Sequence, residues 1–77
     1  MNVDILTPDK KLFEGTADVV TVPGSTGILQ ILNGHAALIS SLGKGNVRVN
    51  TPQGEEVFAI QGGVVEVVNN KVIVLAE

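Results

Sequence analysis

The sequence predicts an all-β fold, arranged as a sandwich or flattened barrel of antiparallel sheets. β-Branched residues dominate, with thirteen Val, six Ile and five Thr in the chain, and such side chains favour strands. They occur in short alternating runs separated by Gly, Pro and Asn. No run has a convincing helical period, and strands that recur roughly every 8–10 residues are typical of sandwiches and barrels.

Alternating apolar and polar residues define the strands in order, and turn residues divide them. The predicted strands are residues 2–6, 11–13, 17–22, 27–32, 36–42, 47–49, 56–60, 64–68 and 71–75. Residues 36–42 are also compatible with one short helix, because Leu38, Ile39 and Leu42 fall on one helical face. We read them as a strand, since Gly43 to Asn46 leads directly into Val47-Arg48-Val49. Asn69-Asn70 joins the last two strands as a tight hairpin.

Length and composition limit the organisation to one domain, predicted over residues 1–77. A domain this short buries only ~60% of the surface that its unfolded chain exposes. The chain has no Cys for a disulfide and a single His. We therefore expect its stability to come from close packing and from a partner that covers part of its surface.

Charge and hydropathy exclude several classes of function. The net charge is −3, and the only aromatic residues are two Phe, so we expect no nucleic-acid binding and no direct lipid insertion. The chain opens without a basic, then apolar, secretory signal. Its longest apolar run, Val72 to Ala76, has five residues, whereas a membrane-spanning helix needs about 20. These features predict a cytosolic compartment.

No motif predicts catalytic, cofactor-binding or metal-binding residues. Gly43-Lys44-Gly45 lacks the spacing and the hydroxyl residue of a phosphate-binding loop, and Gly24 to Gly27 lacks the spacing of a nucleophile elbow. His35 is the only imidazole, and a general base would need a nucleophile and an acid around it, such as Ser40 and Asp18. We expect His35 to cap a turn or to lie in a contact surface.

Two other features are structural or indicate binding. Gly62-Gly63 before an apolar strand predicts a bulge, a positive φ or a close backbone approach. Five segments are apolar on both faces of their strands: Val19-Val20, Leu38-Ile39, Val64-Val65, Val67-Val68 and Val72 to Ala76. Only one face of a sandwich strand meets the core, so either these strands curl at corners or an outward apolar patch marks a protein interface.

Several segments also match a known family in order and spacing along nearly the whole chain. They are Phe13-Glu14-Gly15, Val22-Pro23-Gly24-Ser25 with Gly27, Asn33-Gly34-His35-Ala36 with Leu38-Ile39, Gly62-Gly63-Val64-Val65-Glu66-Val67, and Asn70 to Ala76. The chain thereby resembles the N-terminal β-sandwich of the epsilon subunit of F-type ATP synthase. This resemblance implies two five-stranded sheets and a non-catalytic subunit of the rotor, or central stalk. Such a subunit grips the gamma subunit, rests on the c-ring and couples ion-driven rotation to ATP synthesis at the cytoplasmic face of a bacterial membrane.

The resemblance also implies which positions make these contacts. The gamma-subunit interface would include Thr7, His35, Ala36, Leu38, Ser40 and Leu42, and the c-ring interface would include Ser25, Thr26, Gly27 and Ile28. Gly34, Gly62 and Gly63 would be structural. Ile28 stands where the family usually has an acid, which predicts a more apolar ring contact. Family members usually continue into an inhibitory helical hairpin, so a natural end at Glu77 would imply coupling without hairpin-based inhibition.

Two alternatives belong to other classes of protein. A biotinyl or lipoyl carrier module would need an acceptor lysine at a hairpin tip, where Lys44 and Lys71 are the candidates, but neither has the flanking pattern of such modules. A generic ligand-binding sandwich or small enzyme would need aromatic faces or convergent polar groups. A deep polar pocket near His35 would favour that second alternative.

Overall fold

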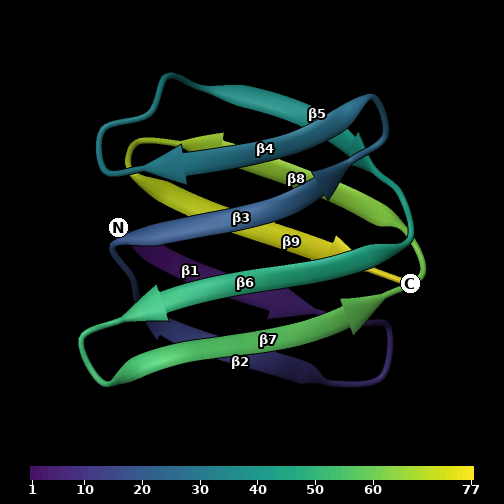
Figure 1. The fold of residues 1–77 in the computed structure, drawn as a ribbon, viewed down its shortest axis with the longest axis horizontal. Helices are drawn as coiled ribbons and strands as arrows, with labels where there is room; N and C mark the ends of the chain where they lie inside the picture. Colours follow the sequence, from purple (N-terminus) through teal and green to yellow (C-terminus); the bar gives the residue numbers. More distant parts are fainter.

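The computed structural model describes residues 1–77 as nine strands without a helix (Figure 1). The strands follow the predicted alternation closely, and residues 36–42 contain a strand rather than a helix. Their bounds are β1 Asn2–Leu6, β2 Lys11–Thr16, β3 Val19–Gly24, β4 Gly27–Leu32, β5 Leu38–Leu42, β6 Gly45–Thr51, β7 Gly54–Ile60, β8 Gly63–Val68 and β9 Lys71–Ala76.

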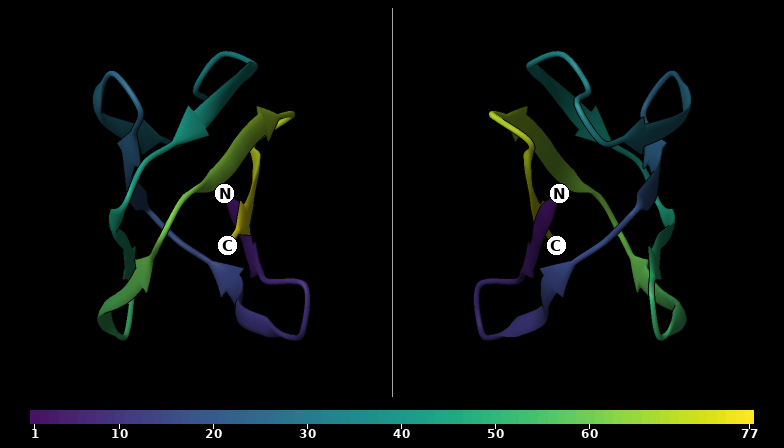
Figure 2. Two further views of the ribbon diagram at one scale, coloured as in Figure 1. Left: turned by 90° about the vertical axis from the view of Figure 1, so that its right-hand side faces the viewer. Right: turned by 90° about the vertical axis from the view of Figure 1, so that its left-hand side faces the viewer.

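The strands form two layers that face each other (Figure 2). One layer has the order β2-β1-β9-β8-β5, and the other has the order β4-β3-β6-β7. A single residue pair, Gly24 opposite Leu42, joins β3 to β5 and links the layers into one nine-stranded sheet. The predicted all-β sandwich or flattened barrel is confirmed, with five strands in one layer and four in the other.

The sequence predicts antiparallel sheets throughout, but one strand pair is parallel. β1 and β9 are parallel, with Val3 opposite Val72 and Ile5 opposite Val74. This pair joins the two ends of the chain, so no turn sequence indicates it. Several strand bounds also differ from the prediction: β2 continues past Phe13 to include Gly15, and β3 is shifted by two residues so that it includes Pro23. Pro23 still takes part in the sheet, because its carbonyl oxygen accepts a hydrogen bond from the Gly43 amide at 2.8 Å.

Branched aliphatic side chains fill the space between the layers. Sixteen hydrophobic residues are buried, no polar residue is, and nine of the sixteen are Val. They are Met1, Val3, Ile5, Ala17, Val20, Val22, Ile31, Leu42, Val47, Val49, Ile60, Val65, Val67, Val72, Val74 and Ala76. Phe13 on β2 and Phe58 on β7 have ring centroids 5.9 Å apart. β2 and β7 are edge strands of the two layers and do not hydrogen-bond to each other, so the two rings pack across this open edge.

Side-chain and terminal groups close one end of the sandwich. The Met1 ammonium donates hydrogen bonds to the Ala17 carbonyl at 3.1 Å and to the Asn33 side-chain oxygen at 2.6 Å. The Gly34 amide donates to the Asn70 side-chain oxygen at 2.8 Å. Three connections far apart in the sequence are thus held together. The chain contains no helix long and apolar enough to cross a membrane.

Candidate docking face

The outer surface of the five-stranded layer divides into an apolar and a charged half. Strand register places one residue from each strand in a continuous row across it: Ile39, Glu66, Ile73, Asp4 and Glu14, from β5 to β2. The β5 side of the row is apolar apart from Glu66, and the β2 side is acidic. The inner residues of the same strands belong to the core, so this division concerns the solvent-facing side alone.

The apolar half consists of five outward residues of β5, β8 and β9: Ile39, Val64, Val68, Ile73 and Leu75. Ile39 is 72% exposed and Leu75 is 53% exposed. They face outward because their strand neighbours point inward; on β8, for example, Val65 and Val67 are buried. Large aliphatic side chains gathered on one face leave apolar surface in water, which is typical of a surface that another molecule covers.

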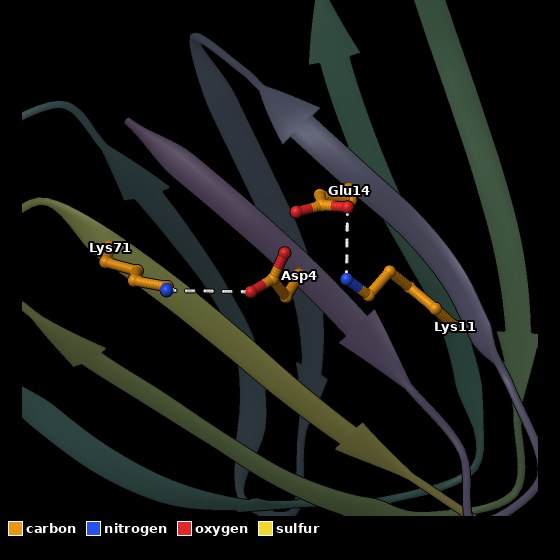
Figure 3. A network of polar contacts seen from close by, with 4 residues as sticks. All are labelled: Asp4, Lys11, Glu14 and Lys71. Atoms are coloured by element: carbon orange, nitrogen blue, oxygen red, sulfur yellow. Dashed lines mark hydrogen bonds and ion pairs between the residues drawn. The ribbon is translucent and has the colours of Figure 1, made fainter.

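The charged half lies on β9, β1 and β2 and is internally neutralised (Figure 3). Lys71 Nζ lies 3.7 Å from Asp4 Oδ2, and Lys11 Nζ lies 3.0 Å from Glu14 Oε1. The hydrogen bond from Lys11 to Glu14, with the charge of that carboxylate, raises the pKa of the lysine above its ordinary value. The Lys11–Glu14 pair is exposed and contributes little to stability. The two pairs keep this half hydrated and make it a poor place for an apolar contact.

Two shallow hollows adjoin the apolar half. One has a volume of about 410 Å³ and lies between β5 and β8, lined by Ala37, Leu38, Ile39, Glu66, Val67 and Val68. The other, of about 380 Å³, includes Leu6, Thr7, Pro8, Val64 and Leu75 among its lining residues. The outward aliphatic side chains therefore form a raised surface between two hollows. These hollows could receive side chains that project from a helix or strand of a partner.

The structure separates the residues that the resemblance assigned to the gamma subunit. Leu42 is a core residue, and Leu38 packs against the core from the inward side of β5. Ser40 lies on the same inward side, so β5 presents Ile39 and Ser41 to solvent instead.

The other three predicted gamma-subunit residues lie in loops outside the apolar half. His35 and Ala36 are in the β4–β5 connection, where His35 Nδ1 is 2.7 Å from the Ala36 carbonyl oxygen. Thr7 follows β1, where its hydroxyl bonds to the backbone of Lys10 at 3.1 Å, and it lines the hollow beside Leu75.

The four residues assigned to the c-ring do lie together, at the turn from β3 to β4. Ser25 and Thr26 form the turn, Gly27 has a φ of +146°, and Ile28 is 78% exposed. The Ser25 hydroxyl lies 2.7 Å from that of Ser41, which ties the turn to β5. Ile28 faces outward from the four-stranded layer, because Leu29 beside it packs against the core.

Two of the three glycines predicted as structural have unusual geometry. Gly34 has a φ of +78° in its turn, and Gly63 has a φ of +144°. A Cβ at Gly63 would overlap the carbonyl oxygen of Leu75, so this backbone approach requires glycine. Gly62 has neither property, since its nearest atoms lie at an ordinary 3.5 Å.

Four residues of the apolar half were not predicted as contact positions, namely Val64, Val68, Ile73 and Leu75, and Ile39 was named only as part of a motif. Their segments were predicted to be apolar on both faces. A deep polar pocket near His35 would favour a ligand-binding sandwich or small enzyme, and none of the surface hollows is lined by His35. Lys71, a candidate for the acceptor lysine at a hairpin tip, begins β9 and pairs with Asp4.

Fold and surface together define an all-β sandwich domain with a partly apolar outer sheet face. The chain belongs to the ATP synthase delta/epsilon chain β-sandwich domain family, whose family model matches residues 1–77. Among its relatives, the ATP synthase epsilon chain of Chlorobaculum tepidum is 43% identical over 76 residues, covering 97% of this chain and 86% of the relative. The epsilon chain of Salinibacter ruber is 40% identical and is matched over 58% of its length by the whole of this chain.

Solved structures show the same fold. A chain in the Euglena gracilis mitochondrial ATP synthase structure, OSCP/F1/c-ring in rotational state 1, superposes with a TM-score of 0.88 at 19% identity, covering 96% of this chain and 48% of that chain. A chain in the Tetrahymena thermophila mitochondrial ATP synthase central stalk/c-ring structure superposes with a TM-score of 0.78 at 23% identity, covering 97% and 61%. The chain thus spans about half to three fifths of the length of these structural neighbours.

Proposed function

We propose that this chain is a non-catalytic central-stalk subunit of an F-type ATP synthase. It docks onto the gamma subunit and the c-ring and couples ion-driven ring rotation to ATP synthesis. The family membership of residues 1–77 supports this function, as do relatives named ATP synthase epsilon chain. The observation that carries the proposal is the apolar half of the five-stranded layer, because a docking subunit needs a surface of this kind.

The gamma subunit covers the apolar half in this proposal. Fully burying an aliphatic side chain such as Ile39 or Leu75 contributes roughly 1.5–3 kcal/mol. The ion-paired residues of β1, β2 and β9 form a hydrated rim beside this contact. The two tightly packed layers transmit torque as one body. The contact extends along β5 to the loop of His35 and Ala36 and, beyond Leu75, to Thr7.

The c-ring contact uses the β3–β4 turn. Ser25, Thr26 and Gly27 offer small polar groups, and Ile28 adds an exposed aliphatic side chain. We expect Ile28→Glu to weaken binding to the cognate ring, because it places a charge where apolar surface is buried. Ring binding measured by surface plasmon resonance checks this, with Gln30→Glu on the same face of β4 as the control. Equal or tighter binding of the Ile28→Glu protein would contradict an apolar ring contact.

The location and domain organisation follow from this role. The epsilon chain is part of a membrane-associated complex, and the subunit lies at the cytoplasmic face of a bacterial membrane in this proposal. Residues 1–77 act as a single docking domain.

Co-purification with a gamma subunit tests the proposal. Hydrogen exchange with and without that subunit then locates the contact. We expect slower exchange in β5 and in the loop of His35 and Ala36 when the gamma subunit is bound. Failure to co-purify, or protection confined to β6 and β7, would contradict the proposal.

A further inference from the structure

Glu66 is the only charged residue within the apolar half of the docking face. On β8 it lies between Val64 and Val68, and the register places Ile39 and Ile73 directly opposite it on β5 and β9. It points outward and is exposed, and it lines the hollow between β5 and β8. Its four directly adjacent neighbours within the sheet surface are thus aliphatic, and Lys71, opposite Val68 and paired with Asp4, lies at a diagonal position.

Unlike the other acids in its row, Glu66 has no partner in this chain. Asp4 pairs with Lys71 and Glu14 pairs with Lys11, and the third ion pair, Arg48 with Glu55, lies on the other layer. No side-chain hydrogen bond reaches Glu66 either. Water alone therefore solvates this carboxylate in the free chain.

Covering the apolar half removes that water. A carboxylate that loses its hydration without gaining a partner opposes binding strongly, because burial of an unpaired charge is costly. The same carboxylate favours one partner over others when that partner brings a cation to it. The aliphatic ring around Glu66 would exclude solvent from such a pair and strengthen it.

We propose that the surface of the gamma subunit that docks here carries a Lys or Arg side chain within an apolar patch, and that this cation pairs with Glu66. This inference rests on the proposed function and adds the specificity determinant of the interface. In this proposal Glu66 favours a partner that places a basic residue opposite the centre of the apolar half. The aliphatic residues around it contribute most of the binding free energy through apolar burial: Ile39, Val64, Val68, Ile73 and Leu75.

Calorimetric titration of the chain with its gamma subunit tests this pairing. We expect Glu66→Gln to weaken binding by at least about tenfold and Glu66→Lys to weaken it further, because a buried pair loses one member and then meets a like charge. The control is Glu56→Gln on β7, which removes an exposed acid without an ion pair from the other layer. It should bind within about twofold of the original chain. Since Glu66 is exposed, all three variants should keep the melting temperature.

Replacing the gamma subunit's Lys and Arg residues one at a time by Glu completes the test. One replacement should restore binding to Glu66→Lys, and its coupling to Glu66 in a double-mutant cycle identifies the cation. Unchanged affinity of Glu66→Gln, or no basic residue that couples to Glu66, overturns the pairing even if the original chain binds. If the original chain does not bind the gamma subunit at all, the proposed function itself fails, and the pairing fails with it.

Discussion

At the scale of single residues, two adjacent glycines have different roles. Gly63 starts β8 with a φ of +144°, and a Cβ there would overlap the Leu75 carbonyl oxygen on β9. Gly62 has no left-handed φ, and a Cβ there would lie at ordinary van der Waals distance, 3.5 Å, from its nearest atoms. The pair was predicted as one structural unit, because a dipeptide does not indicate which residue approaches the neighbouring strand. That information lies in the β8–β9 register.

This difference gives a direct prediction for stability. Gly63→Ala should lower the free energy of unfolding by about 3 kcal/mol, because a strained φ alone costs about 1–3 kcal/mol and the overlap with Leu75 adds to it. Gly62→Ala is the matched control and should change the value by less than about 1 kcal/mol. Urea denaturation followed by circular dichroism measures both. Equal effects would contradict the geometry at Gly63.

At the scale of the strand, alternation explains both the core and the docking face. Val65 is fully buried, whereas Val64 beside it is 39% exposed. We expect Val65→Ala to destabilise the chain by about 2 kcal/mol, since it removes buried methyl groups and leaves a cavity. Val64→Ala should cost less than about 0.5 kcal/mol. Chemical denaturation of the two variants checks this, and the reverse order would mean that β8 is placed with the wrong face inward.

A second prediction at this scale concerns the edge between β2 and β7. Phe13 and Phe58, the only aromatic residues, meet there with ring centroids 5.9 Å apart and planes inclined at 59°. Tilted aromatic pairs contribute about 0.5–1.5 kcal/mol beyond their burial. A double-mutant cycle with Phe13→Leu and Phe58→Leu should give a coupling energy in that range. Strictly additive effects would show that the two rings do not hold the layers together.

Most strands were predictable because period-two alternation and turn residues are local signals. The exceptions have non-local causes. Pro23 remains within β3 because its carbonyl oxygen accepts from Gly43, and β1 pairs in parallel with β9 because the two ends of the chain meet. Neither partner can be inferred from neighbouring residues. The inward direction of Leu38 and Leu42 is likewise not a local signal, since it depends on the position of β5 in the layer.

At the scale of the whole molecule, docking and stability are linked. The chain buries sixteen hydrophobic residues but leaves seven large ones at least 39% exposed, and four of these, on β5, β8 and β9, lie on one layer: Ile39, Val64, Val68 and Leu75. A chain of this size has a small margin of stability, so a partner that covers this face also stabilises the fold by mass action. Length and composition predict such a partner. The position of the face is not predictable from them, because its residues come together only when β5, β8 and β9 pair in the sheet.

The most direct test of this account is the affinity of the gamma subunit for a chain whose apolar half has been made polar. We predict that the double substitution Ile39→Ser and Leu75→Ser weakens binding by about a hundredfold or more, because it removes about 3 kcal/mol or more of apolar burial. Val57→Ser, at a position 46% exposed on the other layer, should leave the affinity unchanged. Titration calorimetry of the three proteins gives the answer, and the account is contradicted if the double variant binds the gamma subunit as tightly as the original chain.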